Sequence, residues 1–110
     1  MPNHRLSIKW TPFALGCLDE IYEYISFREK SSSPAIKLVD DIFKRVNQLL
    51  DFPESGQIEP LLLEIGQESR YLIIASYKLI YEYHSDSNFI IITDVFHTSQ
   101  DPKKLEDRKK

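Results

Sequence analysis

The chain has 110 residues, of which 42% are hydrophobic and 28% are charged, and its formal net charge at pH 7 is −3. This composition excludes a disordered or fibrous protein and indicates one globular domain over residues 1–110, with a charged tail at 101–110. The acidic balance argues against a protein that binds nucleic acid over its whole surface.

The cellular compartment follows from two absences in the sequence. The single cysteine, Cys17, has no partner for an internal disulfide, so the fold does not depend on an oxidising compartment. No run reaches the roughly 18 to 20 apolar residues that a membrane span requires, and the N-terminal segment has no long apolar run. We therefore expect a soluble cytoplasmic protein without direct membrane contact.

The first predicted elements are a strand and a helix. Over residues 5–10, apolar and polar side chains alternate, which is typical of a half-buried strand. Thr11 followed by Pro12 marks a helix start, with the threonine as N-cap and the proline in the first turn. Apolar positions then recur at intervals of three and four, so we expect the helix to continue to about Phe27.

A second helix is predicted by the same signal after a run of serines. Ser33 is the expected N-cap and Pro34 the first helical residue, and the apolar stripe continues to near Asp51, before Pro53. The linker between the two stripes is short, so the helices are expected to form an antiparallel hairpin.

The second half of the chain is predicted to be mostly strands. Residues 53–69 are broken by prolines and glycines and are predicted as a loop, with a possible short extended piece at 61–65. Three runs rich in tyrosine, isoleucine and leucine follow at 70–75, 77–84 and 89–96. These three runs predict an antiparallel meander.

The order of strand, two helices and three strands predicts an α+β fold in which the helical hairpin packs on one face of the sheet. Residues 71–75 and 89–92 are apolar at consecutive positions, so both faces of the sheet are expected to be apolar. Only one helical layer is predicted. Either a second polypeptide covers the other face, or the loop at 53–69 folds across it.

Three weak motifs stand at defined places in this order. They are Arg70 at a strand start, the sequence YKLIY at residues 77–81 and the sequence VFHTSQDP at residues 95–102. Together with the element order, their spacing resembles the RelE/ParE superfamily of toxins from type II toxin–antitoxin modules over nearly the whole chain. The resemblance implies a toxin without a cofactor, neutralised by an antitoxin whose disordered C-terminal part folds onto it. It implies contact with DNA only through the antitoxin.

Two branches of this superfamily imply different activities. RelE-like members resemble metal-free ribonucleases that cut messenger RNA in the ribosome, whereas ParE-like members are similar in fold and are associated with poisoning DNA gyrase. Where the family has an arginine after the last strand, this chain has Ser99, so one side chain that could hold a phosphate is missing. The scarcity of cations between residues 49 and 102 and the acidic chain favour the ParE-like branch.

Two alternatives stay open beside the gyrase-directed toxin. In a ribosome-dependent endoribonuclease, Arg70, His84 and His97 would supply the acid, base and cation that metal-free RNA cleavage needs. In a degenerate toxin, the serine at position 99 would accompany a loss of activity while antitoxin binding is retained.

Residues of the meander and of the tail are the candidates for contact with a partner protein. Each candidate of the meander also has a structural interpretation: Arg70 pairs with Glu68 or Glu82, the tyrosines pack the sheet, and the last histidine is a hydrogen-bonded strand end. The predicted partner-binding residues are Arg70, Tyr77, Tyr81, Tyr83, His97, Lys103 and Lys104.

The cysteine and the histidines carry no further site. Cys17 lies within the apolar stripe of the first helix, so we expect a small buried side chain and not a nucleophile. Together with His4, His84 and His97 it shows no metal-ligand spacing, and no metal site is predicted.

Overall fold

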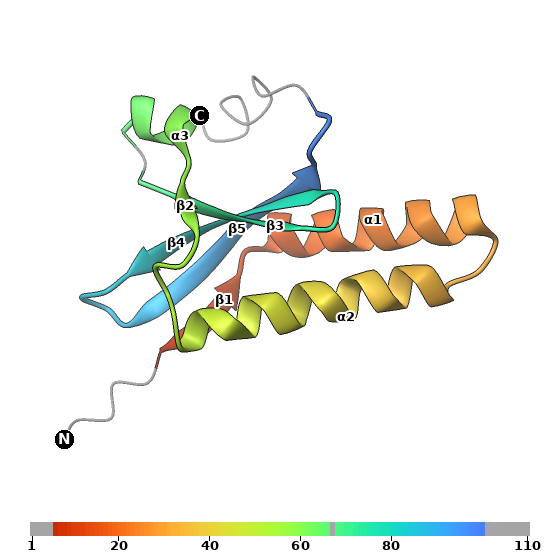
Figure 1. Cartoon of the computed structure of the whole chain (residues 1–110), viewed down its shortest axis with the longest axis horizontal. Coiled ribbons are helices and arrows are strands. Elements are labelled where there is room, and N and C mark those ends of the chain that lie inside the picture. Colours follow the sequence, from red (N-terminus) through yellow and green to blue (C-terminus); the bar gives the residue numbers. More distant parts are fainter. Residues whose placement is uncertain (1–5, 67, 101–110) are drawn as a thin grey trace.

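The computed structural model describes residues 6–66 and 68–100, in which a helical hairpin packs on one face of a five-stranded sheet (Figure 1). The helices are α1 (Pro12–Glu29), α2 (Ser33–Asn47) and α3 (Pro60–Glu64), with a 3₁₀ turn at Gln48–Leu50. The strands are β1 (Ser7–Trp10), β2 (Gln57–Ile58), β3 (Arg70–Ile74), β4 (Tyr77–His84) and β5 (Phe89–His97). The predicted α+β fold is confirmed.

The strand order in the sheet is β1-β5-β4-β3-β2. β1 runs parallel to β5, and every other neighbouring pair is antiparallel, so the predicted meander is present. Between β4 and β5 the register shifts: Ile80 pairs with Asp94, whereas Tyr81 pairs with Ile92. Thr93 is therefore an extra residue in a β-bulge, which bends the strand near its middle.

α1 begins as its sequence predicts. The Thr11 hydroxyl accepts a hydrogen bond from the Ala14 N–H at 3.0 Å, and Pro12 occupies the first turn. The helix runs two residues beyond the predicted end at Phe27, and Lys30 closes it with a left-handed backbone (φ 54°). The chain then reverses its direction in a short turn and enters α2.

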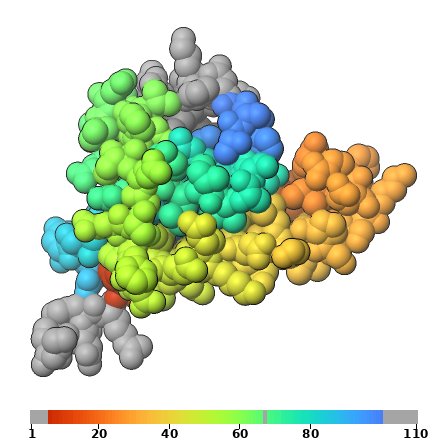
Figure 2. Space-filling model, viewed as in Figure 1, coloured from red at the N-terminus to blue at the C-terminus, as the bar shows by residue number. Residues whose placement is uncertain are grey.

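α2 differs slightly from its prediction at both ends. Its cap position is Ser32 and not Ser33, and no side-chain hydrogen bond caps it. The helix was predicted to continue to near Asp51, but α2 ends at Asn47 and a 3₁₀ turn follows at Gln48–Leu50. Figure 2 shows that the hairpin tip projects past the sheet, leaving the turn between the helices uncovered.

The main core lies between the hairpin and the sheet. α1 packs mainly on β5 and α2 on β3, so the two helices lie over the middle of the sheet (Figure 1). Their apolar stripes share one core with side chains of β3, β4 and β5. Alternate residues of β4 point into this core, and Tyr81 is fully buried there. The fully buried side chains of this core are Ala14, Ile42, Leu49, Leu79, Tyr81, Ile90 and Ile92.

The segment predicted as a loop with an extended piece at 61–65 forms the helix α3 instead. The Glu59 carboxylate accepts a hydrogen bond from the Leu61 N–H at 3.2 Å, and Pro60 occupies the first position. The sequence signal was missed because glutamate is not a favoured N-cap residue and the helix has only five residues.

α3 covers part of the second face of the sheet. Leu62 is fully buried against Ile80, and Tyr71 and Phe96 pack around this contact. For this part of the sheet, the chain itself provides the cover, as in the second of the two alternatives. Ile73, on the same face of β3, stays 46% exposed.

An ion pair ties α3 to the sheet. The Glu59 side chain is almost fully buried and pairs with the ammonium of Lys78. The same ammonium lies 4.2 Å from the centre of the Tyr71 ring.

Within the part of the chain that the structure describes, no helix is long and apolar enough to cross a membrane.

Candidate functional site

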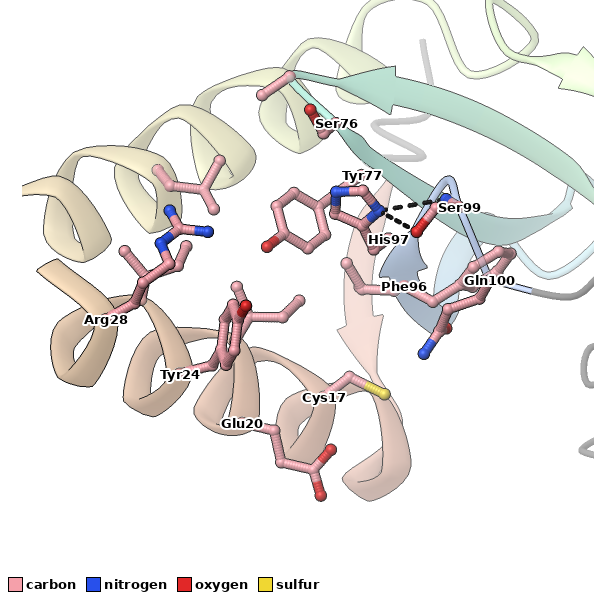
Figure 3. Close-up of a pocket in the computed structure, with 15 residues that line it drawn as sticks. Cys17, Glu20, Tyr24, Arg28, Ser76, Tyr77, Phe96, His97, Ser99 and Gln100 are labelled. Carbon is pink, nitrogen blue, oxygen red and sulfur yellow. Dashed lines mark hydrogen bonds between the residues drawn. The ribbon is translucent and has the colours of Figure 1, made fainter.

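A hollow of about 530 Å³ opens between α1 and the end of the sheet where β5 finishes (Figure 3). Its floor is apolar and is formed by Cys17, Ile21, Ile25, Leu38 and Val95. Its rim is polar and comes from α1, from the β3–β4 turn and from the residues that follow β5. The hollow therefore combines an apolar interior with hydrogen-bonding groups around its opening.

One face of α1 supplies three rim residues. Glu20, Tyr24 and Arg28 recur every four residues and so share that face. The Arg28 guanidinium lies 5.4 Å from the centre of the Tyr24 ring. A hydrogen bond from its Nε to the Glu29 carboxylate (2.9 Å) raises the pKa of Arg28, which keeps the guanidinium charged. In Figure 3 the Glu20 carboxylate points away from the aromatic side chains.

The sheet contributes Tyr77 and His97, which are register partners on β4 and β5. Their rings meet edge to face with centres 5.3 Å apart. Burial raises the pKa of Tyr77, so its hydroxyl is neutral at physiological pH and can donate a hydrogen bond. Both of these residues were predicted to bind a partner.

Ser99 sets the tautomer of the neutral His97 ring. Its backbone N–H donates to Nδ1 of His97 at 3.1 Å, and its hydroxyl oxygen lies 2.8 Å from the same atom. A nitrogen that accepts a hydrogen bond cannot carry the proton of a neutral imidazole, so that proton is on Nε2. Ser99 stands where the superfamily has an arginine. In this structure it orients the neighbouring His97.

The two-residue turn between β3 and β4 forms the upper wall of the hollow. Ala75 has a left-handed backbone with φ 54°, a conformation that a residue with a Cβ adopts at a cost. The Ser76 carbonyl accepts a hydrogen bond from the Thr98 N–H at 2.9 Å. This bond holds the end of β5 against the turn.

Arg70 and Tyr81 were also predicted to bind a partner, but they do not line the hollow. The Tyr81 hydroxyl donates to the Pro53 carbonyl (2.8 Å) and accepts from the Gly56 N–H (2.9 Å). Nη1 of Arg70 donates to the carbonyls of Glu54 (3.1 Å) and Gly56 (2.8 Å). Together they fasten the turn at residues 53–56 to the sheet.

Arg70 therefore has a structural role in the fold, as one of its two interpretations proposed, but its partners are not the ones expected. In place of Glu68 or Glu82, Arg70 bonds to backbone carbonyls, and the Glu54 carboxylate lies 3.9 Å from its Nη2. The Glu82 carboxylate lies instead 3.0 Å from Nε2 of His84.

His84 lies at the opposite end of β4 from the hollow. Its ring stacks on Phe89 with centres 4.6 Å apart. The β4 partner of His97 is Tyr77, and a strand from Tyr77 to His84 spans about 23 Å at the usual rise per residue. Because Arg70 is engaged with the turn at 53–56, the structure does not bring Arg70, His84 and His97 together at one site.

Tyr83, another predicted partner-binding residue, does not line the hollow. Tyr83 is half-buried and packs on the main core. Lys103 and Lys104 fall outside the described residues. Cys17 is buried at the floor, and its sulfur lies 3.8 Å from a carboxylate oxygen of Asp94. Among the residues that the structure describes, no three histidine, cysteine or acidic side chains form a metal-binding group.

Sequence reasoning missed Tyr24 and Arg28, which complete the rim. Their four-residue spacing with Glu20 implies a common helix face, but only the tertiary structure shows that this face meets the end of β5.

Comparison with known proteins identifies a matching family and similar solved structures. Residues 8–102 match the model of a family described as the ParE toxin of the type II toxin-antitoxin system, parDE. A solved structure described as the chromosomal ParDE TA system from P. aeruginosa contains a chain 24% identical to this one, with a TM-score of 0.68. The match covers 87% of this chain and 99% of that chain, and at this identity it supports a common fold. No curated protein matches the sequence significantly.

Proposed function

This chain belongs to the ParE toxin family of type II toxin–antitoxin systems, and from that premise we propose that it is the toxin of such a module. A cognate antitoxin neutralises it by folding onto its surface. Its target is DNA gyrase, which it inhibits by protein–protein contact and not by cleaving RNA. The choice of gyrase follows from the resemblance to ParE-like toxins.

The separation of Arg70, His84 and His97 is the observation that supports contact over RNA cleavage. Metal-free cleavage needs a base, an acid and a cation that reach the same phosphodiester. Arg70 holds the turn at 53–56, and His84 stacks on Phe89 at the far end of β4. His97 is left without the two groups that the ribonuclease hypothesis assigned to it.

Exposed apolar side chains support a protein partner. Phe27, at the hairpin tip, is 86% exposed, and Tyr24 beside the hollow is 59% exposed. A partner that covers such a surface gains about 25 cal/mol for each Å² of apolar area buried. A segment that is disordered alone can use this gain to offset the cost of its own ordering.

One observation favours the endoribonuclease as a second candidate. His97, Tyr77 and Arg28 line one hollow, and between them they offer an imidazole, a phenol and a cation. In this alternative Arg28 replaces Arg70 as the group that stabilises the phosphate. His97→Ala and Arg28→Ala would then remove the activity.

Induction of the chain in growing cells without its antitoxin separates these functions. The gyrase hypothesis predicts growth arrest with DNA breaks and intact messenger RNA, and unchanged toxicity of His97→Ala measured at equal protein level. Messenger RNA cut within codons, and lost with His97→Ala, would establish the endoribonuclease. A chain that binds its antitoxin tightly but arrests no growth would be the degenerate toxin.

A further inference from the structure

We propose that two copies of this chain associate through the exposed face of α1, with the two helices antiparallel and a two-fold axis beside Tyr24. Each copy then places its Arg28 next to Glu20 of the other copy, and the two Tyr24 rings meet at the axis. The inference concerns the chain alone, so it does not depend on the proposed function.

The charges on this face of α1 are arranged symmetrically about one residue. Glu20 lies four residues before Tyr24 and Arg28 lies four residues after it, so the three side chains form one row along the helix. A two-fold axis beside Tyr24 reverses the row of the second copy, and position 20 of each copy then lies beside position 28 of the other. Because these two positions carry opposite charges, the row is complementary to itself.

The packing of α-helices permits this alignment. Residues four apart form ridges on a helix surface, and in the commonest packing class, with axes crossing at about −50°, the ridges of the two helices run parallel. The rows of two copies can therefore lie side by side in opposite directions. From Glu20 to Arg28 the row is about 12 Å long at the usual rise per residue, so both ion pairs fit within one crossing.

The charged groups of the row can form these pairs. In Figure 3 the Glu20 carboxylate points away from the aromatic side chains of the hollow, and it has no ion pair within the part of the chain that the structure describes. The Arg28 side chain is half exposed, and its Nε donates to the Glu29 carboxylate. A guanidinium has five N–H donors, so this bond leaves donors for a second carboxylate.

Two exposed aromatic rings supply the apolar part of the contact. Tyr24 is 59% exposed, and Phe27, three residues later on the same side of α1, is 86% exposed. Together they leave roughly 300 Å² of surface in water, since a large aromatic side chain can bury about 150 to 250 Å². In the antiparallel pair each Phe27 lies against the other helix about one turn before its Tyr24. A standard interface buries about 800 Å² per partner, so we expect a weak dimer that dissociates on dilution.

The shape of the molecule leaves room for a second copy at this face. In Figures 1 and 2 the C-terminal end of α1 projects past the sheet. The outer face of α2 offers no comparable row, because its charges are already paired within the helix, Lys37 with Asp41 and Lys44 with Asp40. The self-complementary row therefore assigns the contact to α1.

Charge reversal followed by sedimentation velocity over a range of concentrations tests the arrangement. Glu20→Arg makes a row that is positive at both ends, and Arg28→Glu makes a row that is negative at both ends. In each variant alone both ion pairs become repulsive at once, so self-association should weaken about 10-fold or more. A mixture of the two variants in equal amounts should associate as well as the wild type, because positive ends then meet negative ends.

Lys37→Glu is the matched control, since it reverses an exposed charge on α2 and should leave the association unchanged. Circular dichroism of every variant checks that the helices are intact. A wild-type chain that stays monomeric at every concentration would leave this face to a different protein and overturn the proposal. A dimer that persists in both single variants, or a mixture that stays as monomeric as its components, would overturn the pairing about Tyr24.

Discussion

The Tyr81 hydroxyl and the Gly56 backbone are in direct contact: the Gly56 N–H donates to that hydroxyl at 2.9 Å, and a Cβ on Gly56 would lie 2.6 Å from it. Tyr81 is fully buried in the core beneath the hairpin. The contact therefore joins the core to the turn at 53–56, which leads into β2 and α3.

Gly56→Ala is expected to destabilise the fold by about 2 kcal/mol, because overfilling a packed site typically costs 1 to 3 kcal/mol. The added methyl would also meet the Tyr71 carbonyl, which cannot move as a side chain tip can. Urea denaturation followed by circular dichroism measures the change. Gly16→Ala is the matched control: nothing lies within 4 Å of its Cβ position in α1, so the same change should stabilise by about 0.5 to 1 kcal/mol.

Tyr81→Phe is expected to cost about 1 to 3 kcal/mol, because it leaves the Gly56 N–H and the Pro53 carbonyl without the hydroxyl that bonds to both. Tyr83→Phe, at a half-buried ring of the same strand, serves as the control and should cost less. Equal stability of the Tyr81→Phe variant and the wild type would show that the hydroxyl does not fasten the turn.

The pH dependence of stability follows from the same hydroxyl. Burial raises the pKa of Tyr81 above its ordinary value of 10.0, so the folded state holds this proton more tightly than the unfolded state. The resulting contribution to the free energy of unfolding is fully present below pH 10, and it is lost as the pH rises through the pKa of Tyr81 in the folded state. Burial raises the pKa of Tyr77 in the same direction. Unfolding measured at pH 8 and pH 11 should show a smaller loss of stability for Tyr81→Phe than for the wild type.

Ala75→Gly is expected to stabilise the protein by about 1 kcal/mol, because glycine adopts φ 54° without the steric cost that a Cβ imposes. Ala14→Gly is the control. Ala14 is fully buried in α1, where glycine costs helix propensity and packing, so that change should destabilise. A destabilised Ala75→Gly variant would mean that the turn does not keep this backbone in solution.

Lys78→Met is expected to destabilise the fold by about 3 kcal/mol, because the almost fully buried Glu59 would lose its partner. The double variant Glu59→Gln with Lys78→Met removes both charges and should recover much of that loss. Chemical denaturation of both variants measures the difference. If the double variant were less stable than Lys78→Met alone, the ion pair would not be what holds α3 in place.

Local signals in the sequence predicted most of the fold. Thr11 and Pro12 placed the start of α1 because the cap and the first turn depend only on adjacent residues. The bounds of β4 agree with the predicted range 77–84. α3 was missed because a five-residue helix has almost no periodicity, and its stability comes from Leu62 and from the pair between Glu59 and Lys78.

The hollow was predictable only in part. Tyr77 and His97 were named from the motifs of β4 and β5, and their proximity follows from strand pairing. Arg28 gave no signal of its own, since an arginine near a helix end is common and its role depends on how α1 crosses the sheet. Arg70 and Tyr81 were also predicted as partner contacts; in the structure they bind the turn at 53–56, and their contact with a partner stays a prediction.

The most direct test of the central claim is a supercoiling assay with purified DNA gyrase, ATP and relaxed plasmid, with and without the purified chain. Our account predicts that the chain stops supercoiling and that linear DNA held covalently by gyrase accumulates after denaturation, an effect that added antitoxin reverses. Supercoiling that proceeds at its normal rate, together with cleavage of messenger RNA on purified ribosomes by the same preparation, would contradict it.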